Sequence, residues 1–235
     1  MTIIRQPCNL DWMEGRFSEV PHGFGQGIGI WSVEIPEDVV VVEEAVGCRD
    51  MERAERMHSM AERGYFLGSH AVLRAVVARA LEQSPTQLEF TSGDFGKPRL
   101  ADGSLHFNMS RSKSLALIGL SEKRDIGVDI EVVGEVPDAE ILAREHLSPQ
   151  EYEAWCRVEP ALAITALLQC WTRKEACLKA VGIGLALSLQ DVNVGWADIG
   201  IPVRSRIIYR DRHWDMLVAS LPMPRGLVAA AALVF

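Results

Sequence analysis

Two short stretches of this sequence carry side chains with the types and spacing needed for metal-assisted chemistry on an anion. The first, Gly127-Val128-Asp129-Ile130-Glu131, alternates β-branched with acidic residues and therefore predicts a strand with both carboxylates on one face. Neighbouring carboxylates repel each other, and Mg²⁺, which prefers oxygen ligands, would cancel that repulsion. A solvated strand edge with two surface acids is the alternative interpretation of this pentapeptide.

The second stretch runs from Trp171 to Ala180 and has a helix-forming composition, with no helix breaker before Gly182. Glu175 and Lys179 are four residues apart, so a helix would place them on one face. One interpretation is an ordinary surface ion pair, worth roughly 0.3–0.5 kcal/mol. The other is a third carboxylate for the metal, with a cation one turn away that suits a phosphate.

Together the two stretches resemble the Sfp-type 4′-phosphopantetheinyl transferases, whose pattern is G-[IV]-D-[IV]-E followed further along by W-x-x-K-E-A-x-x-K. Two upstream motifs of the family, Gly96-Lys97-Pro98 and Phe107-Asn108-Met109-Ser110, also match in the same order. The resemblance covers roughly residues 50–185. One position departs from the pattern, because the family usually has histidine after the serine and this chain has Arg111.

The resemblance implies an α+β fold of two similar halves related by pseudo-twofold symmetry, with the site in the cleft between them. Consistent with this, the order strands, long helix, strands occurs twice, around residues 65–81 and 160–181. We expect an N-terminal half over residues 1–115, which contacts the coenzyme phosphates, and a C-terminal half over residues 116–235, which carries the metal-binding and catalytic residues. Two halves in one chain also favour a monomer.

Periodicity and turn residues predict the individual elements. Helices are expected over residues 51–57, 65–81, 139–145, 149–157 and 160–180, and strands over 30–35, 88–91, 105–109, 115–120, 127–131, 192–196, 203–209, 214–219 and 228–233. The turn between strands 115–120 and 127–131 is so short that the two are expected to pair antiparallel. Ser148, Pro149 and Glu151 predict a capping box at a helix start. Residues 1–28 are expected to be irregular.

The activity implied by the resemblance is transfer of the 4′-phosphopantetheine arm of coenzyme A to a serine of an apo acyl or peptidyl carrier protein, with release of 3′,5′-ADP. Asp129, Glu131 and Glu175 would hold Mg²⁺, which acts as a Lewis acid. Lys179 would stabilise charge on the bridging or leaving oxygen. Glu175, directly or through a water, is the candidate base, which makes Glu175, Lys179 and Asp129 the catalytic set. The sequence leaves open whether the carrier serves fatty-acid, polyketide or nonribosomal-peptide biosynthesis.

The resemblance also implies a set of coenzyme-binding residues: Arg53, Lys97, Pro98, Ser110, Arg111 and Lys179. Arg53 precedes the long N-terminal helix, although Arg49, Arg53 and Arg56 also fit a solvated helix face. Arg111 would remain charged where a histidine titrates, and its longer, bidentate side chain favours the 3′-phosphate. A solvent-facing Arg111 without a ligand is the alternative.

Composition narrows the class of protein further. The 235 residues are 48% hydrophobic and 24% charged, as in globular domains. Five cysteines without close pairing indicate reduced thiols and a cytoplasmic protein. The first residues lack the apolar core of a signal peptide, and no apolar run is long enough for a membrane span. The net charge of −8 argues against nucleic-acid binding, and an anionic substrate then requires basic residues gathered in one cleft.

Two other functions fit some of these residues. A Mg²⁺-dependent pyrophosphate or nucleotide hydrolase also needs acids and lysines, although the chain has no P-loop. A non-enzymatic module that binds coenzyme A or a carrier protein is the second alternative. The presence of all three acids together with Lys179 counts against such a module.

Overall fold

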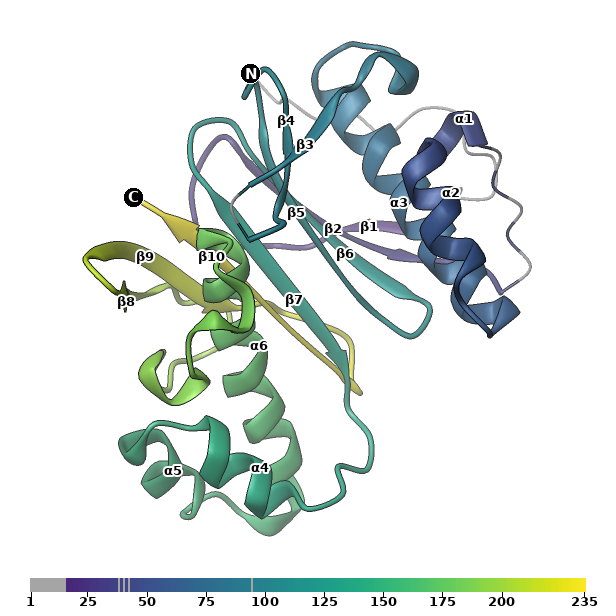
Figure 1. Ribbon diagram of the computed structural model, residues 1–235. Helices are drawn as coiled ribbons and strands as arrows, with labels where there is room; N and C mark the ends of the chain where they lie inside the picture. Colours follow the sequence, from purple (N-terminus) through teal and green to yellow (C-terminus); the bar gives the residue numbers. More distant parts are fainter. Residues whose placement is uncertain (1–15, 38, 40, 42, 94) are drawn as a thin grey trace.

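Two four-stranded antiparallel sheets form the centre of the molecule (Figure 1). The computed structural model describes residues 16–235 except 38, 40, 42 and 94. The N-terminal sheet has the order β1-β2-β6-β5 and the C-terminal sheet the order β7-β10-β9-β8. The strands are β1 (Phe17–Glu19), β2 (Ile28–Glu34), β5 (His106–Ser112), β6 (Leu115–Ser121), β7 (Ile126–Val132), β8 (Val203–Tyr209), β9 (Arg212–Ser220) and β10 (Leu227–Val234). A separate small sheet pairs β3 (Phe90–Ser92) with β4 (Pro98–Leu100).

Six α-helices complete the described part of the chain. They are α1 (Glu43–Val46), α2 (Cys48–Glu55), α3 (Met60–Ala80), α4 (Ala139–His146), α5 (Pro149–Trp155) and α6 (Ala163–Val181). The predicted capping box is present at the start of α5, and α6 ends at Gly182 in the left-handed conformation. Within the described residues, no helix combines the length and apolar character that crossing a membrane requires.

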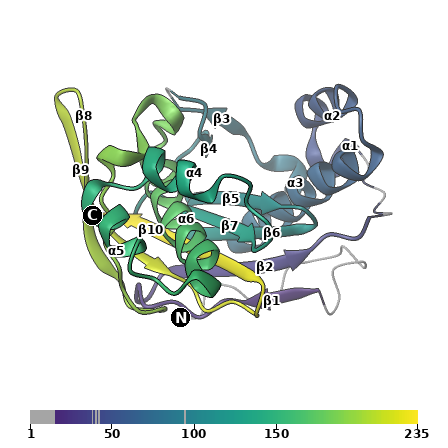
Figure 2. The ribbon, with the colours of Figure 1, turned by 90° about the horizontal axis from the view of Figure 1, so that it is seen from below.

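The two sheets pack face to face, and the long helices cover their outer faces. Leu117 of β6 packs with Val128 and Ile130 of β7 between the sheets. On the other side of β6, Ile118 packs against Val72 of α3. The core under α6 is made in the same way from the outer face of β7 and β10. Figures 1 and 2 show α3 and α6 on opposite sides of the molecule, with the sheets between them.

The two halves share one order of strand pairing around their long helices. In the first half the strand before the long helix, β2, pairs with the last strand, β6, which also pairs with β5. In the second half β7 precedes α6 and pairs with β10, which also pairs with β9. The pseudo-twofold relation and the division at residues 115/116 remain predictions. β6, which starts at Leu115, is hydrogen-bonded within the N-terminal sheet.

Three sequence-based expectations are wrong. β6 does not pair with β7, because β2 and β5 occupy both edges of β6 while β7 pairs with β10. Residues 192–196 form no strand, since the backbone N–H groups of Val194 and Gly195 donate to the buried carboxylate of Glu151 instead of to a neighbouring strand. Residues 1–28 are not irregular throughout, because Phe17–Glu19 forms β1.

Candidate functional site

A glycine sets the distance between α6 and β7. A Cβ on Gly127 would lie 2.1 Å from the carbonyl oxygen of Ala176 and 2.3 Å from the backbone nitrogen of Ala180. Only glycine therefore allows the helix to lie directly on the strand. Asp129 and Glu131 follow Gly127 on the same strand face, so they point towards the helix that carries Glu175 and Lys179.

Asp129 is the centre of the hydrogen-bond network at this contact. Its Oδ1 accepts from Lys179 Nζ at 2.5 Å and from Ser110 Oγ at 2.7 Å, and Lys179 also donates to Ser110 Oγ at 2.9 Å. Three elements, β5, β7 and α6, thus meet at one carboxylate. Asp129 is 3% exposed, and its Oδ2 is buried without a hydrogen-bond partner. Burial raises the pKa of Asp129, although Lys179 and Ser110 oppose the shift.

Glu131 and Glu175 lie close enough to Asp129 to feel its charge. Burial raises the pKa of both glutamates, and the negative charge of Asp129 raises them further. The charge of Glu131 also raises the pKa of Glu175, while Lys179 opposes these shifts. The three acids predicted as metal ligands therefore share one electrostatic environment, in which Asp129 disfavours ionisation of both glutamates.

The chemistry of these acids fits Mg²⁺, although they do not form a ready coordination shell. No three His, Cys, Asp or Glu side chains are close enough to hold a metal ion anywhere in residues 16–235, the four undescribed positions aside. The donors are carboxylate oxygens that repel one another, and Asp129 Oδ2 is buried with no partner. Mg²⁺ binds such oxygens, keeps several waters and needs only one or two protein carboxylates.

Alternate side chains of β5 connect the two sheets. Asn108 Oδ1 accepts from the backbone nitrogen of Val128 at 2.9 Å, and Ser112 Oγ donates to Glu131 Oε2 at 2.8 Å. Ser110, between them, donates to Asp129. Asn108 and Ser112 were not among the predicted site residues. Polar residues at every second position of a buried strand were the signal that could have identified them.

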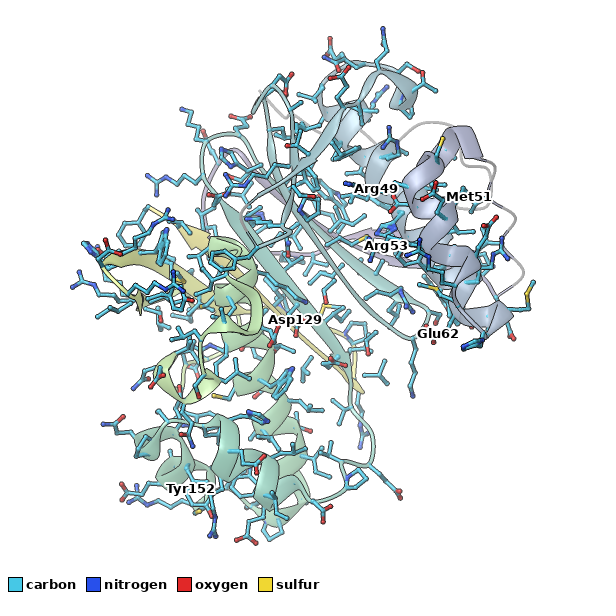
Figure 3. The ribbon with its side chains drawn as sticks, viewed as in Figure 1. Arg49, Met51, Arg53, Glu62, Asp129 and Tyr152 are labelled. Atoms are coloured by element: carbon cyan, nitrogen blue, oxygen red, sulfur yellow. The ribbon has the colours of Figure 1, made fainter. Side chains whose placement is uncertain are left out.

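A cavity of about 540 Å³ adjoins this network. Its basic lining residues come from α2 and α3: Arg49, Arg53, His70 and Arg74. Asp50 is the acid that lines it, and Asn108 and Met109 bring the start of β5 into its wall. Because Ser110 follows directly and contacts Asp129, β5 leads from the cavity to the carboxylates. Figure 3 shows Arg49 and Arg53 on the α2 side and Asp129 near the junction of the halves.

Comparison with known proteins finds one family that part of the chain resembles. Residues 125–232 match the model of the 4′-phosphopantetheinyl transferase superfamily. This part of the chain is similar to that superfamily. That match contains all three acids and Lys179, and the mixed α+β fold agrees with it. The matched residues thus include the β7 and α6 stretches that meet at Asp129. The residues that line the arginine-rich cavity lie outside the match.

Individual phosphopantetheinyl transferases match more than half of the chain. A protein of Synechocystis sp. that carries the family's name is 38% identical over 146 residues, which is 61% of this chain and 59% of the relative. HetI of Nostoc sp. is 33% identical over 62% of both chains. Sfp of Bacillus subtilis is 25% identical over 61% of this chain and 63% of its own. The chain thus spans less than two thirds of the length of these relatives.

The predicted coenzyme contacts fall into two groups. Arg53 and Pro98 line the cavity, and Ser110 and Lys179 lie in the Asp129 network. Lys97 does not line the cavity. Its amine donates to Ala180 O at 2.6 Å, Ile126 O at 3.1 Å and Asp125 Oδ1 at 3.3 Å, so its three N–H groups are used. Burial lowers the pKa of Lys97 to about 8 despite the neighbouring Asp125.

Arg111 is held outside the cavity lining. Its Nη2 donates to Glu62 Oε2 at 2.9 Å and its Nη1 to Lys113 O at 2.8 Å. Glu62 lies in the first turn of α3, so the pair connects that helix to β5. The expected contact of Arg111 with the 3′-phosphate remains a prediction, and it would require a ligand to compete with Glu62.

Proposed function

We propose that this protein transfers the 4′-phosphopantetheine arm of coenzyme A to a serine of an apo acyl or peptidyl carrier protein, with Mg²⁺, and releases 3′,5′-ADP. The observation that carries the proposal is the Asp129–Lys179–Ser110 network beside Glu131 and Glu175. An arginine-lined cavity adjoins that network along β5. The names of the related proteins support the same reaction.

The chain's own residues divide the work of this reaction. Arg53 and its neighbours in the cavity attract the anionic end of the coenzyme. The pyrophosphate would lie along β5, which runs from the cavity wall to Ser110 beside Lys179. The Lys179 ammonium faces the charge that develops on the leaving phosphate oxygen, which is the main requirement in phosphoryl transfer. Asp129 holds that ammonium in place.

Glu175 is the candidate base. Burial and the neighbouring carboxylates raise its pKa, which makes it a better proton acceptor at neutral pH. It would take the proton of the carrier serine as the serine oxygen bonds to phosphorus and the bond to 3′,5′-ADP breaks. Asp129, Glu131 and Glu175 would hold Mg²⁺, which when bound neutralises pyrophosphate charge.

A direct assay tests the proposal. The protein is incubated with coenzyme A, Mg²⁺ and an apo carrier protein, and the carrier is weighed by mass spectrometry. A gain of one phosphopantetheine is the expected result. Hydrolysed coenzyme with an unmodified carrier would instead establish the hydrolase, and intact coenzyme with an unmodified carrier would establish a binding module.

Asp129→Asn tests the metal site. The amide preserves the shape of the side chain but removes the charge, so we expect turnover to be nearly abolished while the fold is retained. Mg²⁺ should raise the melting temperature of the wild type and leave that of Asp129→Asn unchanged, because binding to the folded state is what stabilises it. An equal Mg²⁺-dependent shift in both proteins would exclude Asp129 as a ligand.

We also propose a monomer, since both halves of the site lie in one chain, and analytical ultracentrifugation would test this. Cys156, Cys170 and Cys177 are free thiols, which fits the reducing cytoplasm. The carrier protein served by the enzyme would be identified by offering carriers of the fatty-acid, polyketide and peptide types in the same assay.

A further inference from the structure

His70 of α3 is a partly buried group for which the proposed reaction has no use. It lines the cavity, and its Nδ1 is buried without a hydrogen-bond partner. Asp50 Oδ1 lies 3.7 Å from this nitrogen, which is too long for a hydrogen bond. The ring of Phe66 holds the imidazole edge-on with centroids 4.1 Å apart. A fixed, unsatisfied nitrogen in a cavity wall requires a physical explanation.

Arg74, one turn further along α3, has the same property. Its Nη2 donates to the carbonyl oxygens of Pro85 and Leu88, which fix the guanidinium, but its Nε is buried without a partner. Arg74 also lines the cavity. Two residues of one helix therefore line the same cavity, and each has one buried nitrogen without a partner. A ligand rich in acceptor oxygens that bound between the two side chains would satisfy both.

The charges around His70 favour an anion. Burial lowers the pKa of His70 most, and Asp50 opposes this. The guanidiniums of Arg53, Arg111 and Arg74 lower it further. These groups come from α2, α3 and β5, so the imidazole stands among three cations and one carboxylate and is neutral at neutral pH. A doubly charged anion would reverse the balance and favour a second proton on the ring.

We propose that His70 and Arg74, with Arg53, form a binding site for a phosphate monoester, and that His70 takes up a proton when the monoester binds. This rests on the proposed function, in which the monoester is the 3′-phosphate of coenzyme A. A monoester carries about −1.5 to −2 charges near pH 7, whereas each phosphorus of the pyrophosphate carries about one. The monoester therefore suits the arginine-rich cavity, and the pyrophosphate is left for Lys179 and the metal.

Protonation of His70 determines how the affinity for the monoester changes with pH. Protonated imidazole donates from both nitrogens, so affinity for the monoester rises as pH falls from about 8.5 to 6.5. Below about pH 6 the phosphate itself takes a proton and the gain is lost. Dephospho-coenzyme A, which lacks the monoester, has no such dependence.

Isothermal titration calorimetry of the full chain tests the inference. Coenzyme A, dephospho-coenzyme A and 3′,5′-ADP are titrated between pH 6.5 and 8.5 in two buffers that differ in ionisation enthalpy. We expect proton uptake with coenzyme A and 3′,5′-ADP but not with dephospho-coenzyme A. His70→Gln should remove the uptake and weaken coenzyme A binding by roughly tenfold or more. His58→Gln, an exposed histidine between α2 and α3, is the matched control and should change neither.

Other outcomes would overturn the inference. Proton uptake that persists in His70→Gln would remove His70 from the monoester site. Equal losses of affinity for coenzyme A and dephospho-coenzyme A would do the same. The transferase proposal would still stand in both cases if the carrier gains its phosphopantetheine. An unmodified carrier with intact uptake in the wild type would defeat the transferase alone. Absence of binding by all three compounds, together with an unmodified carrier, would defeat both. Melting curves of each variant show whether it is folded.

Discussion

At the scale of single residues, the site depends on the different surroundings of the two carboxylate oxygens of Asp129. Asp129 Oδ1 accepts from Lys179 and Ser110, whereas Oδ2 is buried without a partner. The lysine offsets part of the cost of burying the acid. It is also held where it can meet the phosphate. The same carboxylate can therefore position a cation through one oxygen and offer the other to a metal.

Lys179 is predicted to act on the transition state more than on substrate binding. Lys179→Ala should lower kcat by roughly 10² or more, with a smaller effect on KM, because a preorganised cation is most valuable when charge develops. Steady-state kinetics with varied coenzyme A measures both. Lys123→Ala, an exposed lysine before β7, is the matched control. A raised KM with kcat unchanged in Lys179→Ala would contradict the assigned role.

At the scale of elements, α6 is the part that assembles the site, and it is fixed on two faces. One face lies on β7 at Gly127. On another, the buried Lys174 lies 2.6 Å from Glu151 of α5 and donates to Leu189 O and Val192 O. The strand and the neighbouring helix thus both determine where Glu175 and Lys179 point.

Gly127→Ala should displace α6 from β7. The added methyl group would overlap the backbone of α6 at Ala176 and Ala180, which cannot yield as a side chain can. We expect a stability loss of about 1–3 kcal/mol or more and a large fall in turnover. Denaturant unfolding and the carrier assay measure these. Gly134→Ala, where an added Cβ meets nothing within 4 Å, is the control. Wild-type activity in Gly127→Ala would show that the close approach is not required.

Lys174→Met should destabilise the fold by about 3–5 kcal/mol, because Glu151 would keep a buried charge without its partner. Combining it with Glu151→Gln should recover part of the loss, since the amide oxygen can still accept from Val194 and Gly195. Urea denaturation of both variants measures the difference. A single variant as stable as the wild type, or a double variant less stable than the single one, would contradict this account.

At the scale of the whole molecule, the halves are held together by polar contacts that cross from one sheet to the other. Asn108, Ser110 and Ser112 of β5 bond to β7. At the start of β7, Asp125 lies within 3.3 Å of Lys97, Arg99 and His106 of the first half. Since Asp129 and Glu131 are on β7, and the cavity is in the first half, these contacts fix one part of the candidate site relative to the other.

The Asp125 cluster predicts how stability changes in acid. Burial opposes ionisation of Asp125, but His106, Lys97 and Arg99 outweigh it and lower the pKa to about 2. A carboxyl with a folded-state pKa below its unfolded value stabilises the protein above the unfolded pKa. That contribution is lost as pH falls from about 4 towards 2. The unfolding free energies of wild type and Asp125→Asn should therefore converge over this range. A constant difference would contradict the prediction.

The sequence by itself determined the residues that belong together and the local geometry that presents them. A period of two places Gly127, Asp129 and Glu131 on one strand face, and a period of 3.6 places Glu175 and Lys179 on one helix face. The helix start at Ser148 and the end of α6 at Gly182 were predictable from the capping residues themselves. These features depend on backbone geometry within a few residues, so a local pattern is enough to reveal them.

The tertiary structure alone decided which partners the side chains meet. Lys97 bonds to Ala180, 83 residues away, and Arg111 to Glu62, 49 residues away. Similarly, β7 joined a different sheet from its neighbour β6. His70 and Arg74 look like ordinary helix residues in the sequence, and only the packing of α3 against α2 and β5 leaves their nitrogens unsatisfied at one cavity. Such contacts depend on which surfaces the whole chain buries together, and no local pattern contains that information.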